Sequence, residues 1–201
     1  MPSFHIIYGT GEGQTAKVAS RIADVLADRG HQATTVDASV RNDDVALEDA
    51  DSVLVGSSIH AGKQQSAVEA FVRSNQEALA SMPTAFFQVS LSSADEQGAE
   101  QAAGYVEAFV EETGWHPDRI GLFGGALRYS EYGFLKRLLM KQIAKRKVED
   151  PPDPDETGDI EFTDWNEVEA FAADVAAFVE GRLGVAPPNA NPSDDSSGDA
   201  G

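Results

Sequence analysis

Short apolar runs alternate along this chain with longer stretches in which apolar residues recur at helical spacing. Val18, Ile22 and Leu26 would share one face of a helix over 15–29, and Gly30 would end it. The final helix is expected to begin after the N-cap candidate Asp164, with Glu167 as its capping-box partner, and to end at Gly181. Strands are expected at 4–8, 34–36, 52–55, 83–90 and 120–127, and further helices at 67–80 and 100–113.

This alternation predicts an α/β fold, in which helices cover both faces of a doubly wound parallel sheet. Five strands fit the order 2-1-3-4-5. Such sheets bind ligands at the carboxyl ends of their strands, where the strand order reverses. The loops after the first, third and fourth strands are therefore the places to look for a site.

The loop after the first strand, GTGEGQT at 9–15, suits a phosphate monoester. Gln14 stands where a dinucleotide fingerprint needs its third glycine, and no Gly-Lys-Ser/Thr closes a P-loop. The loop instead offers the Thr10 and Thr15 hydroxyls and the free N–H groups of a helix N-terminus, which favour anions. The carboxylate of Glu12 would have to point away from a phosphate. The alternative is a plain glycine-rich turn capped by Thr15.

Two further loops could enclose a flat ring. GSSIHAGK at 56–63 has small residues that allow close approach, and Ile59 and His60 could cover the ring. The alternative for His60 is an exposed loop histidine. SLSSADEQG at 90–98 would form a third wall. One loop for a phosphate and two for a ring describe an FMN site. A metal site is not expected, because the four histidines show no ligand spacing.

The chain carries 34 acidic and 15 basic residues, a formal net charge of −19. A dense carboxylate surface stays hydrated at high salt, where its self-repulsion is screened, so we favour salt adaptation and expect stability to rise in molar salt. A plain solvated surface and a nucleic-acid mimic or metal buffer are the alternatives. The absence of cysteine excludes disulfides and thiolate sites. No apolar run approaches the roughly 18 residues of a membrane span, and a signal peptide is not expected.

One segment departs from this acidic background. Residues 128–147 hold seven basic residues and one acid, a charge of +6, so the remainder carries −25. A helix over 134–147 would place Arg137, Lys141 and Lys145 in one row, as in helices that lie on anionic membranes or bind acidic partners. The alternative is a surface helix packed on its own domain. We expect one domain over 1–183 with an insertion at about 128–160, and a disordered acidic tail over 184–201.

Several motifs resemble one family, the flavodoxin-like, menaquinone-dependent protoporphyrinogen IX dehydrogenases. The resemblance runs from residue 4 to about residue 180. GALRY, the basic helix and TDW in that order are its most specific part. The motifs are TGEGQT (10–15), VGSSIHAG (55–62), SMPTAFFQVSL (81–91), WHPDR (115–119), GALRYSEY (125–132) and FTDW (162–165).

The resemblance implies a flavodoxin-like fold, an FMN cofactor, and oxidation of protoporphyrinogen IX to protoporphyrin IX with electrons passed to a membrane quinone. It implies a cytoplasmic protein that can associate peripherally with the inner face of the cell membrane. No nucleic-acid partner, catalytic acid or catalytic base is expected. Carried over by position, the phosphate residues are Thr10, Gly11, Gly13, Gln14 and Thr15, with Glu12 in the same loop, and the ring residues are Ser57, Ser58, Ile59, His60, Ser90 and Leu91.

Arg128 and Tyr129 are candidates for the substrate carboxylates, because they follow the last strand near the expected flavin edge. A surface salt bridge and a packed aromatic ring are the alternative. Lys136, Arg137, Lys141 and Lys145 would face the membrane or the substrate. Two other classes compete with the enzyme: a flavodoxin-type electron carrier that docks an acidic redox partner, and a flavin-free domain of the same fold.

Overall fold

The computed structural model describes residues 1–40, 47–94, 96–127 and 160–185. Its centre is a five-stranded parallel sheet in the order β2-β1-β3-β4-β5, which confirms the predicted fold class and strand order. The strands are β1 (Ser3–Gly9), β2 (Gln32–Asp37), β3 (Ser52–Ser58), β4 (Thr84–Ser90) and β5 (Arg119–Gly124).

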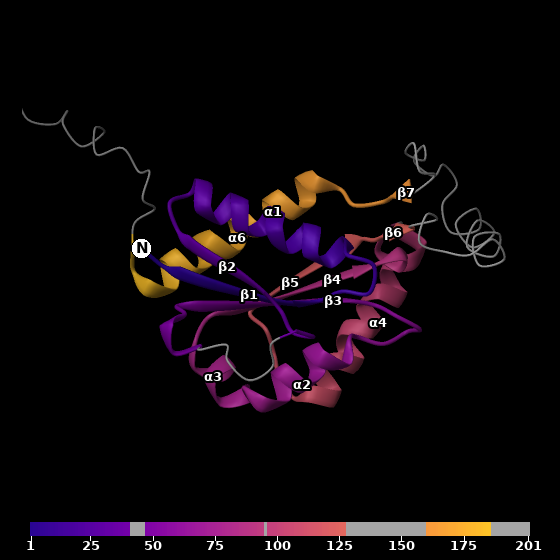
Figure 1. Ribbon diagram of the computed structural model, residues 1–201, viewed down its shortest axis with the longest axis horizontal. Helices are drawn as coiled ribbons and strands as arrows, with labels where there is room; N and C mark the ends of the chain where they lie inside the picture. The colour runs from indigo at the N-terminus through magenta and orange to yellow at the C-terminus, as the bar shows by residue number, and fades with distance from the viewer. Residues whose placement is uncertain (41–46, 95, 128–159, 186–201) are drawn as a thin grey trace, which may run out of the picture.

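Helices cover both faces of the sheet (Figure 1). On one face lie α1 (Gln14–Asp28) and α6 (Trp165–Leu183). On the other lie α2 (Ser66–Ser74), α3 (Gln76–Ser81) and α4 (Glu96–Thr113). Two short 3-10 helices, η1 (Leu47–Asp49) and η2 (Leu91–Ala94), precede β3 and follow β4. None of the helices within the described ranges is long and apolar enough to cross a membrane.

A small antiparallel pair stands apart from the main sheet. It joins β6 (Ala126–Leu127) to β7 (Ile160–Glu161), at the carboxyl ends of the main strands (Figure 1). The predicted strand at 120–127 is therefore two strands that separate at Gly125. The insertion between β6 and β7, and the tail from residue 186, lie outside the described residues.

Three helix boundaries differ from the sequence-based expectation. The helix expected at 67–80 is two helices, because Asn75 leaves helical geometry (φ −118°) and its side-chain amide donates to the carbonyl of Phe71 at 2.8 Å. The helix expected from residue 100 already begins at Glu96. Gly181 does not end the last helix, which continues to Leu183 and is capped by Gly184 in the left-handed region (φ 66°). The cap at Asp164 is confirmed, since its carboxylate accepts from Asn166 N.

The core consists of one apolar layer on each side of the sheet, because successive strand residues point to opposite faces. Phe87 packs beneath α1 and α6, and its neighbour Phe86 packs beneath α2 and α4; both are fully buried. Phe87 fills the space above Gly56, where a Cβ would lie 2.0 Å from Cζ of the ring. Both phenylalanines are therefore core residues.

Candidate functional site

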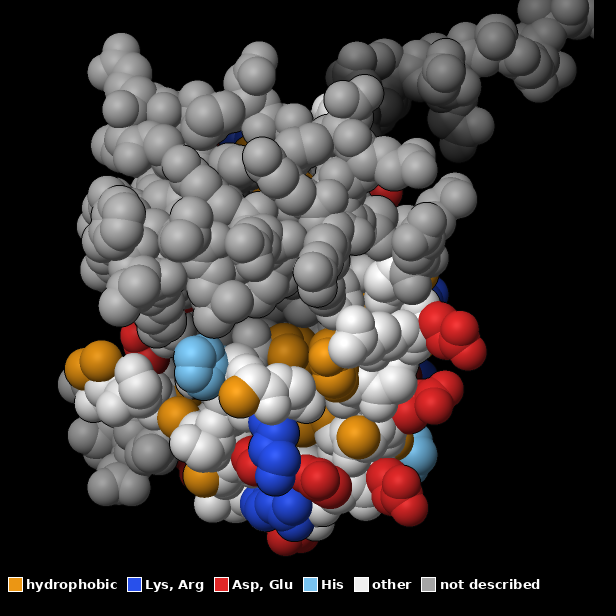
Figure 2. Space-filling view, turned by 90° about the vertical axis from the view of Figure 1, so that its right-hand side faces the viewer, with side chains coloured by type: hydrophobic (Ala, Val, Ile, Leu, Met, Phe, Trp, Pro, Cys, Tyr) orange, Lys and Arg blue, Asp and Glu red, His pale blue; other side chains and the backbone are white. Residues whose placement is uncertain are grey.

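The three loops singled out from the sequence lie at one edge of the sheet, where β1, β3 and β4 end (Figure 1, right-hand side). Figure 2 looks onto this face of the molecule. In its described part, apolar side chains are visible between polar ones, and most of the acidic side chains lie toward the lower and right-hand margins. The carboxyl edge is therefore where the fold brings the candidate residues together.

The loop after β1 is folded around its own threonine. The hydroxyl of Thr10 accepts from the amide of Gly13 at 2.8 Å, and Gly13 adopts the left-handed conformation (φ 85°) that glycine allows. The first intrahelical bond of α1 runs from Lys17 N to Gly13 O at 3.2 Å. The amides at positions 14–16 precede that bond, so they have no acceptor within the helix and are available to an anion.

Thr15 provides the clearest sign that this loop can bind a ligand. Its side chain is fully buried, and its hydroxyl has no hydrogen-bond partner among the described residues. Thr15 does not cap α1, because the N-cap position is Gly13 and no side chain accepts from the helix amides there. A buried hydroxyl without a partner carries a desolvation cost, and a phosphate oxygen beside the loop would remove that cost. These residues therefore fit a phosphate monoester.

The tyrosine that precedes this loop does not add charge to it. Burial and, secondarily, the nearby carboxylate of Asp37 raise the pKa of Tyr8. Its phenol therefore stays neutral over the ordinary pH range. Glu12 of the loop is half-buried.

The two serines at the end of β3 organise the neighbouring loops. The Ser58 hydroxyl accepts from the amide of Gly11 at 3.2 Å and from the side-chain amide of Gln65 at 2.9 Å. The buried Ser57 hydroxyl accepts from Gln65 N at 2.9 Å. The phosphate-loop candidate and the ring-loop candidate are thus tied to each other through Ser58.

The residues after Ser58 form a tight reverse turn. Ile59 is half-buried and donates its N–H to Val89 O at 3.1 Å. His60 and Lys63 exchange backbone hydrogen bonds of 2.9 and 3.1 Å around Ala61 (φ 50°) and Gly62 (φ 80°). The His60 side chain is exposed at this turn. That exposure suits either a cover for a ring or a plain loop histidine, and the role in ring binding stays a prediction.

The third wall begins at Ser90, the last residue of β4. The Ser90 hydroxyl lies 2.8 Å from that of Ser93 and accepts from Ser93 N at 3.2 Å, which folds the chain into η2. Leu91, the first residue of η2, is half-buried. The Ser90 carbonyl accepts from Gly125 N at 3.0 Å, so the end of β4 also holds the segment that follows β5.

Several glutamines that support the site were missed by the sequence reasoning. Gln64 donates to the side-chain oxygen of Gln88 at 2.7 Å, and Gln88 donates to Ala102 O at 3.0 Å. Gln88 is fully buried inside β4, and a glutamine within the otherwise apolar run PTAFFQV was the available signal. Gln101 bridges Ser92 and the hydroxyl of Tyr105 at 2.9 and 2.7 Å.

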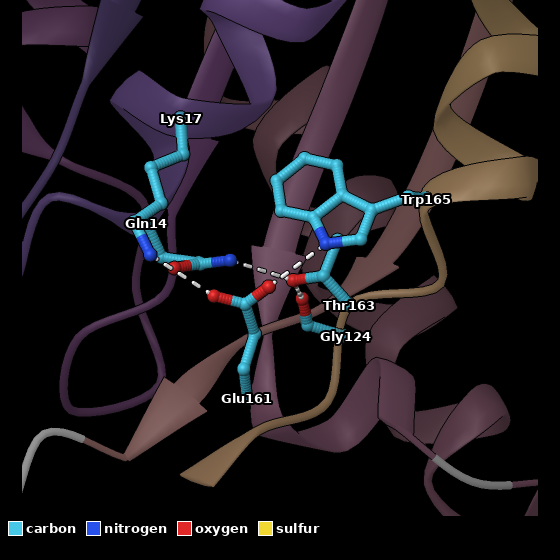
Figure 3. Close-up of polar contacts among 6 residues, drawn as sticks. All are labelled: Gln14, Lys17, Gly124, Glu161, Thr163 and Trp165. Atoms are coloured by element: carbon cyan, nitrogen blue, oxygen red, sulfur yellow. Dashed lines mark hydrogen bonds and ion pairs between the residues drawn. The ribbon is translucent and has the colours of Figure 1, made fainter. Parts of the chain in front are cut away.

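Thr163 was also missed, although it lies within the FTDW motif. Its hydroxyl accepts from the side-chain amide of Gln14 at 2.8 Å and donates to Gly124 O at 2.8 Å (Figure 3). Beside it, Glu161 pairs with Lys17 at 3.1 Å and accepts from the indole N–H of Trp165 at 2.9 Å (Figure 3). These contacts bind the segment that enters α6 to the start of α1.

The remaining predicted site residues cannot be placed. Arg128, Tyr129, Lys136, Arg137, Lys141 and Lys145 lie outside the described residues, and so does the expected helix at 134–147. Across the part of the chain that the structure describes, no three histidine, aspartate or glutamate side chains gather where a metal ion could bind.

Comparisons with known proteins agree with the fold. Residues 5–155 match the family model described as a flavodoxin domain. A protoporphyrinogen IX dehydrogenase [quinone] of Escherichia coli K12 is 34% identical over 176 residues, which cover 87% of this chain and 95% of that protein. A protein of the same name from Leishmania major is 33% identical, over 94% of this chain and 80% of its own length.

A solved short-chain flavodoxin associated with a PDU bacterial microcompartment superimposes with a TM-score of 0.55 at 15% identity. The match covers 89% of this chain and 99% of that flavodoxin, and it supports the fold alone. Three observations lead to one conclusion. The carboxyl edge is built from three loops of small residues, a family model matches most of the sequence, and two relatives are more than 30% identical to this chain. This chain belongs to the flavodoxin-domain family, and within it to the group that contains the protoporphyrinogen IX dehydrogenases of E. coli and L. major.

Proposed function

We propose that this protein is an FMN-dependent oxidoreductase that oxidises protoporphyrinogen IX to protoporphyrin IX. The observation that carries the proposal is the 34% identity to the E. coli protoporphyrinogen IX dehydrogenase [quinone] across 87% of the chain. The oxidation removes six electrons and six protons from the porphyrinogen. Three molecules of a quinone, each accepting two electrons and two protons, balance it.

The carboxyl edge fits the phosphate end of FMN. Thr15 offers a buried hydroxyl without a partner among the described residues, and the amides at 14–16 directly follow the loop that the hydrogen bond from Gly13 N to Thr10 stabilises. Binding there needs no Lys or Arg, because a helix N-terminus already favours an anion. When bound, FMN would supply the redox chemistry, while the protein supplies position, exclusion of water and electrostatic tuning. We assign the ring to Ser57, Ser58, Ile59, His60, Ser90 and Leu91.

Membrane association through the basic segment is a separate part of the proposal. A lipid quinone is reached at a membrane surface, and a segment of charge +6 in a chain of net charge −19 suits an anionic surface. Neutralising Lys136, Arg137, Lys141 and Lys145 should weaken binding to anionic liposomes at low salt. Equal binding by the variant and the parent protein would remove the membrane role. Arg128 and Tyr129 remain our candidates for contact with the substrate carboxylates.

The experiment that tests the function uses protein purified in high salt and loaded with FMN. Protoporphyrinogen IX is added without oxygen, with and without a menaquinone analogue, and porphyrin fluorescence is followed against a sample lacking protein. Quinone-dependent porphyrin production is the expected result. A flavin-loaded protein that produces no porphyrin would instead support the electron-carrier alternative, and a protein that binds no flavin would contradict both.

A further inference from the structure

The hydrogen-bond chain from Gln14 through Thr163 to Gly124 joins two parts of the site that are far apart in sequence. Gln14 is the first residue of α1, directly after the phosphate-binding loop. Thr163 lies between β7 and α6, and Gly124 ends β5. The chain therefore connects the loop with the β6–β7 pair, which flanks the insertion at residues 128–159 (Figure 3).

The direction of this chain is fixed by chemistry. A carbonyl can only accept, so the single proton of the Thr163 hydroxyl goes to Gly124 O at 2.8 Å. The hydroxyl must then accept from Gln14, which turns the NH₂ group of that amide toward Thr163 at 2.8 Å and its oxygen away. Gln14 is 4% exposed, so the orientation is set inside the protein and not by solvent.

The absence of a side chain at Gly124 allows the segment to lie close to the end of β5. A Cβ at Gly124 would lie 2.1 Å from the carbonyl oxygen of Phe162, so the two backbones are in direct contact. Phe162 N donates to Gly125 O at 2.9 Å, and Gly125 N donates to Ser90 O at 3.0 Å. Residues 162–163 are therefore tied to Gln14 on one side and to the ends of β4 and β5 on the other.

A second link runs beside the first. Glu161 of β7 is held at once by Lys17 of α1 at 3.1 Å and by the indole of Trp165 at 2.9 Å. Lys17 is also the residue whose N–H closes the first turn of α1 on Gly13. Both links end on the first turn of α1, so the phosphate-binding loop and the base of the insertion are packed as one unit.

We propose that Gln14 and Thr163 are positioning residues that couple occupancy of the phosphate-binding loop to the stability of the β6–β7 pair. This inference rests on the proposed function, because it takes the phosphate end of FMN as the occupant. An occupied loop fixes the first turn of α1, and that turn fixes Thr163 and the base of the insertion. Since coupling between two sites is reciprocal, a flavin that stabilises the β6–β7 pair is itself bound more tightly, by the same factor, when the pair is formed. Breaking the Thr163 link should therefore weaken flavin binding.

The test measures the Kd for FMN by flavin fluorescence, at a temperature chosen well below the melting temperature of each variant. Thr163→Val keeps the shape of the side chain but removes both hydrogen bonds, and we expect the Kd to rise between about threefold and tenfold. Thr163→Ser keeps the hydroxyl and should retain the parent Kd. The control is Thr113→Val, which likewise removes two hydrogen bonds of one hydroxyl, to Phe109 O at 2.7 Å and from Trp115 N at 3.3 Å, at the opposite end of the sheet and at a more buried position; its Kd should not change.

Hydrogen exchange supplies a readout that does not depend on activity. Adding FMN should slow exchange of the Phe162 amide in the parent protein and in Thr113→Val, and much less in Thr163→Val. Should Thr163→Val fail to fold, Gln14→Met removes the donor from the other end of the chain with little change of shape, and it should raise the Kd within the same range.

The outcomes separate the two proposals. A folded Thr163→Val or Gln14→Met that binds FMN as tightly as the parent, with a melting temperature lowered as in Thr113→Val, would overturn the coupling and leave the proposed function intact. A parent protein that does not bind FMN would overturn the proposed function, and the coupling with it.

Discussion

The two edges of the central sheet are closed by different kinds of side chain. At the carboxyl edge, the loops after β1, β3 and β4 are held by hydroxyls and amides from Thr10, Ser58, Gln65 and Ser90. At the amino edge, charged groups dominate. Glu180 of α6 accepts from Arg29 at 3.1 and 3.2 Å and lies 2.8 Å from the ring nitrogen of the buried His31.

Further carboxylates complete the amino edge, where Asp51 accepts from Ser3 N and Asp118 from Thr84 N. Ion pairs taken out of water hold one geometry, because breaking them leaves an uncompensated charge. Hydroxyls and amides can rotate and can either donate or accept, so they can rearrange around a ligand at low cost. We therefore expect the amino edge to anchor the fold and the carboxyl edge to bind the ligand.

The largest expected effect comes from adding a side chain at the tight contact between Gly124 and Phe162. In Gly124→Ala the new Cβ would meet a backbone carbonyl at 2.1 Å, and backbone cannot yield as a flexible side chain can. We expect the free energy of unfolding, measured by urea titration, to fall by about 3 kcal/mol. The FMN affinity should fall as well, because Thr163 would be displaced.

Gly104→Ala is the control for that variant. Gly104 lies within α4, where a Cβ would meet no atom within 4 Å. Alanine should stabilise the helix there by up to about 1 kcal/mol. Equal unfolding curves for the two alanine variants would show that the contact at Gly124 is not tight.

Breaking the amino edge should cost stability but not binding. Glu180→Ala leaves Arg29 and His31 without their common partner. Because Arg29 is one-third exposed and so partly solvated, we expect the free energy of unfolding to fall by only about 2 kcal/mol. The Kd for FMN should equal that of the parent protein. A Kd raised along with the instability would mean that the two edges do not have separate roles.

Removing a single hydroxyl from the carboxyl edge should weaken FMN binding while lowering stability only slightly. Ser58→Ala deprives Gly11 N and the Gln65 side chain of a shared acceptor, so the FMN Kd should rise several-fold while the free energy of unfolding falls by only about 1 kcal/mol. Ser81→Ala, which removes an exposed hydroxyl bond to Ala78 O, is the control and should change neither quantity. A Ser58→Ala protein with unaltered affinity would argue against a binding role for this edge.

The smallest expected effect is a pH dependence of stability that arises from Glu69, which contributes to neither the amino-edge nor the carboxyl-edge contacts described above. A hydrogen bond that the protonated Glu69 carboxyl donates to Glu112, then burial and the Glu112 charge, raise the pKa of Glu69 above its ordinary value of 4.5. A raised carboxyl pKa means that the contribution of Glu69 to stability is present below the ordinary pKa and is lost as pH rises through the higher value.

Glu69→Gln keeps a neutral donor at every pH. Its melting temperature relative to the parent should therefore increase from about pH 4 to about pH 8. A difference that stays constant over this range would mean that Glu69 and Glu112 do not share a proton in solution.

Much of the fold and part of the candidate site followed from the sequence. Apolar runs such as 4–8 and the helical stripe of Val18, Ile22 and Leu26 determined the elements, because burial of an apolar face is a local property that periodicity records. The alternation of elements then determined a parallel sheet and the edge at which a ligand would bind. GTGEGQT indicated a phosphate loop because its glycines, its hydroxyls and the start of the helix are adjacent in the chain, so the signal is local.

Only the tertiary structure decided which side chains that are far apart in the sequence form hydrogen bonds with each other. Gln14 and Thr163 are separated by 149 positions, and nothing in either neighbourhood specifies that one donates to the other. Nothing in the local sequence marks the cluster formed by Arg29, His31 and Glu180. It forms only because the packing of α1 against α6 brings Glu180 to the other two residues. Side-chain hydrogen bonds depend on direction and on distances within tenths of an ångström, whereas sequence patterns record only which face of an element is apolar.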